Sequence, residues 1–564
     1  MRSLPPEKLA QARCALEDVR AGKPVEAALR GNPWNAAPLH KSALVAAYNE
    51  LVESGDWEPD EDLLARIRLK PVRTLSGVTT VTVLTKPYPC PGKCIFCPDD
   101  VRMPKSYLPD EPGAMRAVEN DFDPYAQAAS RLQALAAVGH PTDKIELLIL
   151  GGTFSSYRRD YQAWFVQRCF QAMNESINRQ ARGPQYPKNG YTRTGAGERE
   201  EKNDKTFAPF AVNESLAQIH LQNESAAHRN VGLSVETRPD EVTPDELAWF
   251  RSLGVTKVQM GAQSLDDHIL ELNQRGHTVA DLRRAVALLR AGGFKIVLHW
   301  MPNLLGATPD SDRADFPRLW DGLCPDEIKI YPTQLLENAP LYEIWKRGDY
   351  RPYSTDELIS LIADVKPSIP RYCRVNRVIR DIPSTHVVAG NKRTSLRQDV
   401  QAELARRGIR CQCIRCREVR GEKVEAGSLR LDDLVYHPDG AEEHFLSFVT
   451  PEDRIAGFLR LSLPGPDSPR AGTGTTSPAT GLTDLEGAAI IREVHVYGQS
   501  LGVGKEQTGA AQHAGLGTRL LAEAERIARA KSYRRMAVIA AVGARQYYLE
   551  RGFVRGELYL TKIL

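Results

Sequence analysis

Apolar runs of strand length recur through the first two thirds of the chain, and helical patterns separate most of them. Six such runs lie between about residues 78 and 335: VTTVTVLT, KIELLILGG, VGLSVET, KVQMGAQS, KIVLHWMP and EIKIYPT. The segments between them, such as DPYAQAASRLQALAAVG at 123–139, have the 3.6-residue apolar period of amphipathic helices. This alternation predicts a parallel α/β sheet, and six units predict a partial (β/α)6 barrel.

The pattern changes at both ends of the chain. Residues 1–70 predict short amphipathic helices, and from about 425 the chain shows alternating strand-like runs that end in strand, Gly-containing loop, long helix, strand and helix. The polar segment 180–228 predicts a flexible insertion, and the segment 465–481 has no core-forming pattern. We therefore expect a helical region at 1–70, a barrel at 71–370, a linker at 371–424 and a second α/β domain at 425–564.

Composition narrows the functional classes only in part. Of 564 residues, 42% are hydrophobic, and 74 Lys and Arg face 71 Asp and Glu, so a nucleic-acid surface would have to be local. Six of the ten cysteines lie in two tight clusters, which favours metal ligation in a reducing compartment over a disulfide framework. We find no apolar stretch of about 18 residues, so we expect a cytoplasmic protein without a membrane partner.

The first cysteine cluster, CPGKCIFC, directly follows the first strand and contains Cys90, Cys94 and Cys97. Three thiolates can hold three irons of a 4Fe-4S cluster and leave the fourth iron open for a small molecule. A zinc site is the alternative, although zinc motifs more often bring their cysteines as CxxC pairs. The spacing CxxxCxxC resembles the radical S-adenosylmethionine (SAM) superfamily, which implies that SAM binds this iron and yields a 5′-deoxyadenosyl radical on reduction.

Polar residues stand where the predicted strands end, which is where reactive groups collect in (β/α) barrels. Gly151 and Gly152 resemble the glycine motif that binds the SAM amino group, and Lys329 and Tyr331 are candidates for the catalytic, substrate-facing positions. Each such residue alone is as often a cap or a turn residue. The further cofactor-binding candidates at strand ends are Glu236, Arg238 and Gln263.

A glycine-containing loop, QHAGLG, lies between a strand and the long C-terminal helix, where backbone N–H groups could hold a pyrophosphate. With the strand before it and two tyrosines after it, the loop resembles GNAT-type acetyltransferases. The resemblance implies that the loop binds coenzyme A, that Glu493 or a tyrosine acts in catalysis, and that the tyrosine protonates the leaving thiolate. Packing against the core is the alternative for either tyrosine. The candidates are Glu493, Val494, His495, Val496, Gln512, His513, Ala514, Gly515, Gly517, Tyr547 and Tyr548.

The second cysteine cluster has the spacing CxCxxC and lies in the predicted linker, with a histidine about 25 residues upstream. Three thiolates and one imidazole can form a closed, tetrahedral and therefore structural zinc site. The histidine could equally be an ordinary hydrogen-bonded residue. The predicted zinc ligands are Cys411, Cys413, Cys416 and His386.

A radical SAM loop and a GNAT-type loop on one chain resemble the catalytic subunit of Elongator, the tRNA uridine acetyltransferase family, over residues 65–564. Matching segments include CPGKCIFCPDD, SVETRPD, NQRGHT and REVHVYG. The resemblance implies conversion of a tRNA wobble uridine to 5-carboxymethyluridine with SAM and acetyl-CoA, with hydrogen abstraction from the acetyl methyl group. It also implies that Lys144 contacts acetyl-CoA. Further expected partners are an external electron donor and a homodimer or larger complex.

A wobble base has to leave the anticodon stack to enter a barrel, which suits recognition by basic and aromatic groups. Our candidates for tRNA phosphate contact are Arg66, Arg68, Lys70 and Arg73, although a run of charges is usually a solvated face. Two other functions stay open. One is a protein lysine acetyltransferase with the barrel as scaffold, and the other is an RNA-binding assembly subunit with degenerate cofactor sites.

Overall fold

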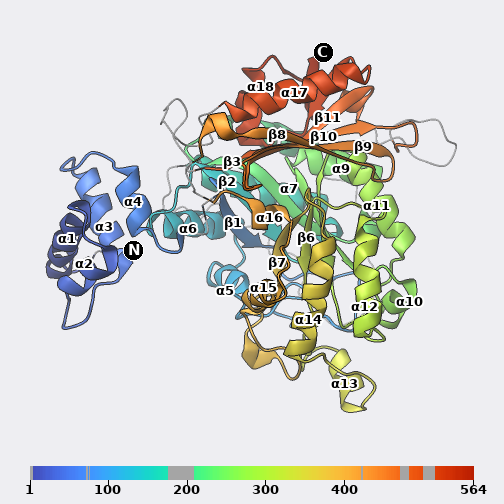
Figure 1. Cartoon of the computed structure of the whole chain (residues 1–564), viewed down its shortest axis with the longest axis horizontal. Helices are drawn as coiled ribbons and strands as arrows, with labels where there is room; N and C mark the ends of the chain where they lie inside the picture. The colour runs from blue at the N-terminus through green and yellow to red at the C-terminus, as the bar shows by residue number, and fades with distance from the viewer. Residues whose placement is uncertain are drawn as a thin grey trace.

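Three units follow one another along the chain in the computed structural model: a small helical unit, a parallel sheet with helices, and a second sheet with two helices (Figure 1). The structure describes residues 4–71, 74, 76–175, 209–420, 424–469, 482–498 and 515–564. In this part of the chain no helix combines the length and the apolar character needed to cross a bilayer.

The N-terminal unit is a four-helix cluster with an apolar core of its own. Its helices are α1 (Pro6–Arg20), α2 (Val25–Gly31), α3 (Lys41–Glu53) and α4 (Glu61–Ile67). Leu16, Val19, Leu44 and Val45 are fully buried in this core, which is separate from the core of the sheets. Figure 1 shows the unit at one side of the molecule, nearest to α6 (Pro124–Ala136).

The central unit is an open parallel half-barrel whose strands pair in chain order. This confirms the predicted α/β class and the order of the six apolar runs, but a seventh strand extends the sheet. The strands are β1 (Thr79–Leu84), β2 (Lys144–Leu150), β3 (Arg229–Thr237), β4 (Lys257–Gln263), β5 (Lys295–Trp300), β6 (Glu327–Ile330) and β7 (Arg374–Val378).

The seventh strand was missed because its sequence, RVNRV, contains two arginines and an asparagine instead of an apolar run. It pairs in parallel with β6, from Glu327 opposite Arg374 to Ile330 opposite Val378. The sheet therefore continues past residue 370, where the sequence had placed the end of the barrel. The predicted partial barrel of six strands is therefore a half-barrel of seven strands.

Helices cover the outer face of the half-barrel and connect its strands. The predicted insertion at 180–228 is also corrected, because its second part forms α8 (Pro209–Asn223), which packs beside α7, and β3 begins at Arg229. The longer helices are α5 (Pro112–Glu119), α7 (Arg159–Asn174), α9 (Pro244–Ser252), α11 (Val279–Ala291), α14 (Thr355–Val365) and α15 (Leu396–Arg406). The short ones are α10 (Asp267–Leu272), α12 (Pro309–Asp315), α13 (Leu341–Lys346) and α16 (Ile414–Arg417).

The C-terminal unit is a second seven-stranded sheet, with the order β13-β14-β12-β11-β10-β9-β8. Its strands are β8 (Arg430–Tyr436), β9 (Ala441–Val449), β10 (Ile455–Pro464), β11 (Ala488–Val496), β12 (Arg535–Val538), β13 (Val554–Arg555) and β14 (Leu560–Ile563). Helix α17 (Leu516–Ala530) connects β11 to β12, the one parallel pair among these described strands, and α18 (Arg545–Leu549) follows β12.

This second sheet sits across the amino-terminal ends of the half-barrel strands (Figure 1). Arg492 of β11 pairs with Asp326, which directly precedes β6, and donates to the Phe294 carbonyl at 2.8 Å, directly before β5. Arg492 also pairs with Glu443 at 3.0 Å, and all three charged side chains are 0% exposed. Removing one member of such a set leaves a buried charge without its partner.

We expect Asp326→Ala to lower the free energy of unfolding by about 3–5 kcal/mol, because Arg492 and Arg460 would both lose a buried partner. Chemical denaturation followed by tryptophan fluorescence measures this change. The control is Asp349→Ala, whose pair with Arg347 at 3.4 Å is about two-thirds exposed and contributes less than about 0.5 kcal/mol. Equal losses in the two variants would contradict a structural role for the buried pair.

The same carboxylate gives a pH expectation. Burial alone would raise the pKa of Asp326, but Arg492 and Arg460 outweigh it and lower the pKa to about 2. Because the folded-state pKa lies below the unfolded one, the stabilisation is present above about pH 4 and is lost as the pH falls toward 2.

Candidate functional site

The loop after β1 places three cysteines at the carboxyl-terminal mouth of the half-barrel. Cys94 is 5% exposed, and Cys90 and Cys97 are half-buried. The backbone of the loop is held by two segments that are distant in sequence. The Ile95 amide donates to the Asn273 carbonyl at 3.2 Å, and the Leu341 amide donates to the Ile95 carbonyl at 2.9 Å. The three thiols therefore lie in one anchored loop that opens toward the strand ends.

Two buried arginines flank these thiols. Arg275 donates from Nη1 to Cys94 Sγ at 3.4 Å, and Arg238 donates from Nη2 to the Arg275 carbonyl at 2.8 Å. Hydrogen bonding from Cys97 first, and then the charge of Arg275, lowers the pKa of the Cys94 thiol well below its usual range. Arg238 Nη1 is buried and has no hydrogen-bond partner among the described residues. A Cβ on Gly92 would overlap that same atom, so the cysteine loop and the guanidinium are closely fitted.

This surrounding fits an anionic iron–sulfur centre. A cluster held by three thiolates carries negative charge. The Arg238 guanidinium pairs with Asp240 at 2.9 Å through Nη2, and its buried Nη1, which has no partner among the described residues, remains available to such an anion. Cys90, Cys94 and Cys97 are the residues that would hold it, with Arg238 and Arg275 beside them.

The turn after β2 is built from two glycines that other residues could not replace. Gly151 and Gly152 have φ angles of 141° and 88°, and a Cβ on Gly151 would overlap the Thr85 hydroxyl. Thr153, the next residue, lies with Oγ1 3.7 Å from Cys90 Sγ. The glycine turn therefore brings backbone atoms close to the cysteine loop. This is the turn for which the sequence predicted contact with the amino group of SAM.

Polar residues from the other strand ends fill the mouth of the half-barrel. Glu236 accepts a hydrogen bond from Tyr107 Oη at 2.7 Å and lies 3.8 Å from Lys329 Nζ. Tyr331 contacts the His299 ring edge to face, with centroids 5.4 Å apart. Burial first, and then the carboxylate of Glu236, raises the pKa of Tyr107. Sequence reasoning missed Tyr107, because it comes from the loop beyond the cysteines and from no strand end.

One cavity of about 1680 Å³ runs from this mouth through the half-barrel to the C-terminal sheet. Near the mouth it is lined by Cys90, Cys94 and Gly152, and in its middle by Lys257, Gln259 and Lys329. At the far end its lining includes Val494, Val496, Gly515, Gly517 and Tyr547. Both groups of predicted cofactor residues, about 420 residues apart in the chain, therefore border a single space.

The far end of the cavity is a wedge between two parallel strands that separate. β11 and β12 pair from Ala488 opposite Arg535 to Ile491 opposite Val538, and beyond that point residues 493–496 pair with β10 alone. Helix α17 begins here after Gly515, which adopts a left-handed φ of 62°. A Cβ on Gly517 would overlap the Tyr547 hydroxyl, so these two residues lie in contact distance across the wedge.

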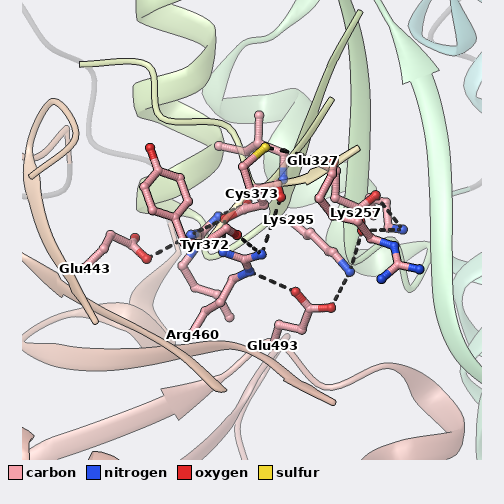
Figure 2. Close-up of polar contacts among 12 residues, drawn as sticks. Lys257, Lys295, Glu327, Tyr372, Cys373, Glu443, Arg460 and Glu493 are labelled. Carbon is pink, nitrogen blue, oxygen red and sulfur yellow. Dashed lines mark hydrogen bonds and ion pairs between the residues drawn. The ribbon is translucent and has the colours of Figure 1, made fainter. Parts of the chain in front are cut away.

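Glu493, a predicted catalytic residue, is engaged in ion pairs. Figure 2 shows its carboxylate between Arg460, which donates from Nε at 2.9 Å, and Lys295. Lys295 also pairs with Glu327 at 2.8 Å, and Glu327 pairs with Lys257 at 3.2 Å (Figure 2). Burial alone would raise the pKa of Glu493, but Lys295 and Arg460 outweigh it and lower the pKa. The carboxylate therefore stays ionised and is poorly suited to accept a proton.

Two titratable residues of the wedge, His495 and Tyr547, are neutral near pH 7. Burial lowers the pKa of His495 to about 4, and its Nε2 has no hydrogen-bond partner among the described residues. Burial raises the pKa of Tyr547, whose ring lies 3.7 Å from the Arg551 guanidinium carbon. Tyr548 is 6% exposed and packs edge to face on Phe553, so of the two tyrosines Tyr547 is the better placed proton donor.

Lys144 is the first residue of β2 and therefore lies away from the cysteines, at the end that the C-terminal sheet covers. It lines the same cavity. Five other strands of the half-barrel also begin with a charged residue that lines this cavity, namely Arg229, Lys257, Lys295, Glu327 and Arg374. Sequence reasoning did not use this signal, although a charged residue at or near the start of five of the six apolar runs was visible.

The second cysteine cluster is compact. The Sγ atoms of Cys411, Cys413 and Cys416 lie within 4.8 Å of one another, and the first two residues are buried. The prediction that His386 is the fourth ligand is wrong. His386 is not part of this group, and its Nε2 lies 2.5 Å from Asp110 Oδ2. Its role as the fourth ligand was inferred from sequence distance alone, which does not determine spatial proximity.

The tRNA candidates fall into three groups. Arg66 and Lys70 are exposed, as a phosphate contact requires. The prediction that Arg68 contacts tRNA is wrong. Arg68 is 7% exposed, and its Nε donates to the Gly139 carbonyl at 2.5 Å, which fixes the N-terminal unit to the half-barrel.

Four predicted site residues lie outside the described part of the chain: the tRNA candidate Arg73 and the coenzyme A candidates Gln512, His513 and Ala514.

The half-barrel with three cysteines in the loop after its first strand defines a radical SAM protein. Family models agree: residues 88–316 match the radical SAM superfamily, and residues 325–406 match the radical SAM C-terminal domain. Membership of this superfamily implies SAM and a 4Fe-4S cluster as cofactors.

Comparison with individual proteins gives the family. A tRNA uridine(34) acetyltransferase of Dehalococcoides mccartyi is 41% identical over 87% of this chain and 99% of its own length. Elongator complex protein 3 of Dictyostelium discoideum is 33% identical over 89% of this chain and 85% of its own. The solved structure of archaeal Methanocaldococcus infernus Elp3, lacking residues 1–46, superposes with a TM-score of 0.69 at 33% identity, over 87% of this chain and 100% of that one. The chain belongs to the family of tRNA uridine(34) acetyltransferases and Elongator complex protein 3.

We expect Arg275→Met to lower the midpoint potential of the reconstituted cluster by about 60–120 mV. The variant removes a charge-assisted hydrogen bond to Cys94, and such donors to cluster sulfurs stabilise the reduced state. A redox titration monitored by electron paramagnetic resonance measures the shift. Arg275→Lys keeps the charge and should retain most of the potential. An unchanged potential in Arg275→Met would mean that the guanidinium only supports the loop.

Proposed function

We propose that this chain converts the wobble uridine of tRNA to 5-carboxymethyluridine, using SAM and acetyl-CoA. The observation that carries the proposal is the single cavity bordered by Cys90 and Cys94 at one end and by Val494 and Tyr547 at the other. Two cofactors that border one cavity can act on one substrate, whereas separate activities would need no shared space. The names of the relatives support tRNA uridine as that substrate.

At the mouth, the cluster and SAM supply a carbon-centred radical when bound. The chain's own contribution is to hold and orient these groups. Gly151 and Gly152 present backbone atoms at a turn that excludes side chains, and Glu236, fixed by Tyr107 and Lys329, offers a carboxylate beside the mouth. Lys329 and Tyr331 face the cavity from the end of β6 and are our candidates for contact with the uracil ring.

At the wedge, a GNAT-type arrangement would hold acetyl-CoA. The separation of β11 and β12 exposes backbone groups of residues 493–496 to an extended thioester arm, and the first turn of α17 offers unpaired N–H groups to a pyrophosphate. Tyr547 keeps its proton because burial raises its pKa, so it can donate that proton to a leaving thiolate. Lys144 provides a positive charge on the same side of the cavity.

Protein lysine acetyltransfer is supported less well. A lysine ammonium has to lose a proton before it attacks a thioester, and a free carboxylate on the strand beside the acetyl group is a common base for this step. Here that carboxylate, Glu493, is neutralised by Lys295 and Arg460. A radical route that forms a carbon–carbon bond does not require an ammonium group to be deprotonated first, although the C5 proton of the uracil and one electron still have to be removed.

We further propose a structural metal centre, with zinc as the ion, at Cys411, Cys413 and Cys416. It would hold the segment between α15 and β8 against β7, where the Ile414 amide donates to the Cys373 carbonyl at 3.0 Å. The anticodon region of tRNA and an external electron donor are the partners that this function would require, and a homodimer or a larger complex is compatible with it.

The decisive assay incubates the reconstituted protein anaerobically with tRNA, SAM, a reductant and acetyl-CoA, followed by mass spectrometry of the nucleosides. We expect carboxymethyluridine with the native chain and none with Cys94→Ala, while tRNA binding stays within about threefold. Loss of both product and tRNA binding in Cys94→Ala would mean that the cluster is structural. Acetylated peptide formed without SAM, and no carboxymethyl product, would replace this function with protein acetylation.

We expect Lys144→Met to raise the KM for acetyl-CoA about tenfold, because the variant removes a cation from the wedge side of the cavity. Cleavage of SAM without acetyl-CoA should stay unchanged, since the mouth lies at the other end of the half-barrel. The matched control is Lys346→Met, an exposed lysine on α13. A variant that loses SAM cleavage and acetyl-CoA dependence together would show that Lys144 serves the fold.

A further inference from the structure

The two cofactor sites of the proposed function lie too far apart for one acetyl group to occupy both. Lys144 at the start of β2 lines the wedge side of the cavity, and Leu150 at the end of β2 lines the mouth side. A strand rises about 3.3 Å per residue, so the seven residues of β2 separate the two sides by about 20 Å. Reacting atoms have to come within about 3–3.5 Å of each other. One reactant therefore has to travel through the half-barrel.

The radical source is the part that cannot travel. Cys90, Cys94 and Cys97 belong to a loop whose backbone is anchored to Asn273 and Leu341, and SAM would be bound to the cluster that these cysteines hold. The acetyl group, in contrast, is attached to the end of a long arm of rotatable single bonds. A tRNA base that enters the mouth does not shorten the distance between the acetyl methyl group and the radical. The acetyl group therefore has to move toward the mouth.

The lumen between the two sites has a polar lining, unlike the interior of a closed barrel. Closed (β/α) barrels are filled by layers of Val, Ile and Leu side chains. Here the cavity is lined by alternate residues of several strands, and most of these residues are polar or small. They are Thr80 and Thr82 of β1, Glu146 and Leu148 of β2, Gly232 of β3, Lys257, Gln259 and Gly261 of β4, His299 of β5 and Lys329 of β6.

Buried polar atoms at both ends of the lumen also lack a partner. His495 Nε2 at the wedge and Gln263 Oε1 at the end of β4 have no hydrogen-bond partner among the described residues, and both residues line the cavity. A buried polar atom without a partner costs free energy, so these positions favour a polar ligand. The arm of coenzyme A carries amide groups that both donate and accept hydrogen bonds. It is therefore chemically suited to this lumen.

A glycine leaves the lumen open where an ion pair crosses its wall. Lys257 of β4 pairs with Glu146 of β2, so the pair spans β3, which lies between these strands. Gly232 is the β3 residue opposite Glu146, and a Cβ on it would lie 3.5 Å from Glu146 Cγ, an ordinary contact distance. Its φ is not positive, so the backbone does not require glycine here. Glycine inside a strand often marks the close approach of a ligand.

We infer that the lumen of the half-barrel is the passage through which the thioester arm of acetyl-CoA reaches the mouth, and that Gly232 sets the width of this passage. A larger side chain at Gly232 would extend into the lumen or push the Glu146–Lys257 pair into it. The inference rests on the proposed function and adds the route of the acetyl group. Gly232 has no reactive group, so it is a positioning residue.

The passage can be tested without any reaction, by alkylation of a thiol placed in the lumen. Thr82→Cys adds this thiol on β1, opposite Leu148 and therefore nearer the mouth than Gly232. Mass spectrometry of the peptide follows its alkylation by iodoacetamide on the full chain. Acetonyl-CoA, a non-hydrolysable analogue of acetyl-CoA, should slow alkylation about tenfold at about ten times its Kd, because few chains then stay unoccupied. Adenosine 3′,5′-bisphosphate, which lacks the arm, should leave the rate unchanged.

Gly232→Leu should uncouple the two sites while leaving each intact. We expect carboxymethyluridine to fall about 100-fold, because the acetyl group is kept from its reaction partner. Cleavage of SAM without acetyl-CoA and the Kd for adenosine 3′,5′-bisphosphate should stay at native values, which also shows that the variant folds. When Gly232→Leu is combined with Thr82→Cys, acetonyl-CoA should no longer protect the thiol.

Two further variants are matched controls for the added side chain. Gly232→Ala adds one methyl group at an ordinary contact distance and should retain most of the product. Gly427→Leu makes the same substitution at a glycine whose Cβ would meet no atom within 4 Å, outside the cavity, and should match the native chain.

The outcomes separate the passage from the proposed function. Native product levels in Gly232→Leu would overturn the inference, as would equal alkylation rates with and without acetonyl-CoA in a chain that still forms carboxymethyluridine. Loss of SAM cleavage together with product in Gly232→Leu would also overturn it, because the glycine would then serve the fold. Protection of the thiol in a chain that forms no carboxymethyluridine would support the passage and overturn the proposed function alone.

Discussion

A buried chain of ion pairs between the two sheets is the constraint on which the rest of the structure depends. Arg492 and Asp326 are wholly buried, and Arg460 links Asp326 to Glu493. Each charge alone would oppose folding, so the set is stable only when every member has its partner. A tilt of the C-terminal sheet would separate charges that water cannot reach. The two ends of the cavity are therefore held at one distance and one orientation.

This constraint changes the interpretation of the wedge. A carboxylate beside an acetyl group suggests a base, but Glu493 belongs to the frame that holds the sheets together (Figure 2). Proton transfer then falls to groups that are neutral near pH 7. Burial lowers the pKa of His495 to about 4 and raises that of Tyr547, so the first can accept a proton and the second can donate one. In the proposed function, radical chemistry at the other end would supply the reactive carbon.

The elements that the sequence predicted correctly are those encoded locally. Six apolar runs and a three-cysteine spacing are visible in short windows, and the half-barrel and its cysteine loop follow from them. The failures involve contacts between distant segments. β7 carries arginines because neighbouring charged groups pair with them, as Arg374 does with Glu418 at 2.8 Å. Arg68 serves a carbonyl 71 residues away, and His386 meets Asp110 instead of the cysteines. No window of sequence contains both partners of such contacts.

The amino-terminal ends of the strands show how an open half-barrel differs from a closed barrel. In closed barrels this end supports stability, and reactive groups collect at the opposite end. Here Lys144, Lys257 and Lys295 begin their strands with charges that line the cavity. Such charges would be costly if the covering sheet offered them no polar partner. Two of the three are paired: Lys257 with Glu146 and Glu327, and Lys295 with Glu493. Because the C-terminal sheet covers this end without filling it, the half-barrel has a polar site at each end of one lumen. A lysine at the beginning of β2 can therefore face a cofactor site, although in closed barrels reactive groups collect at the opposite strand ends.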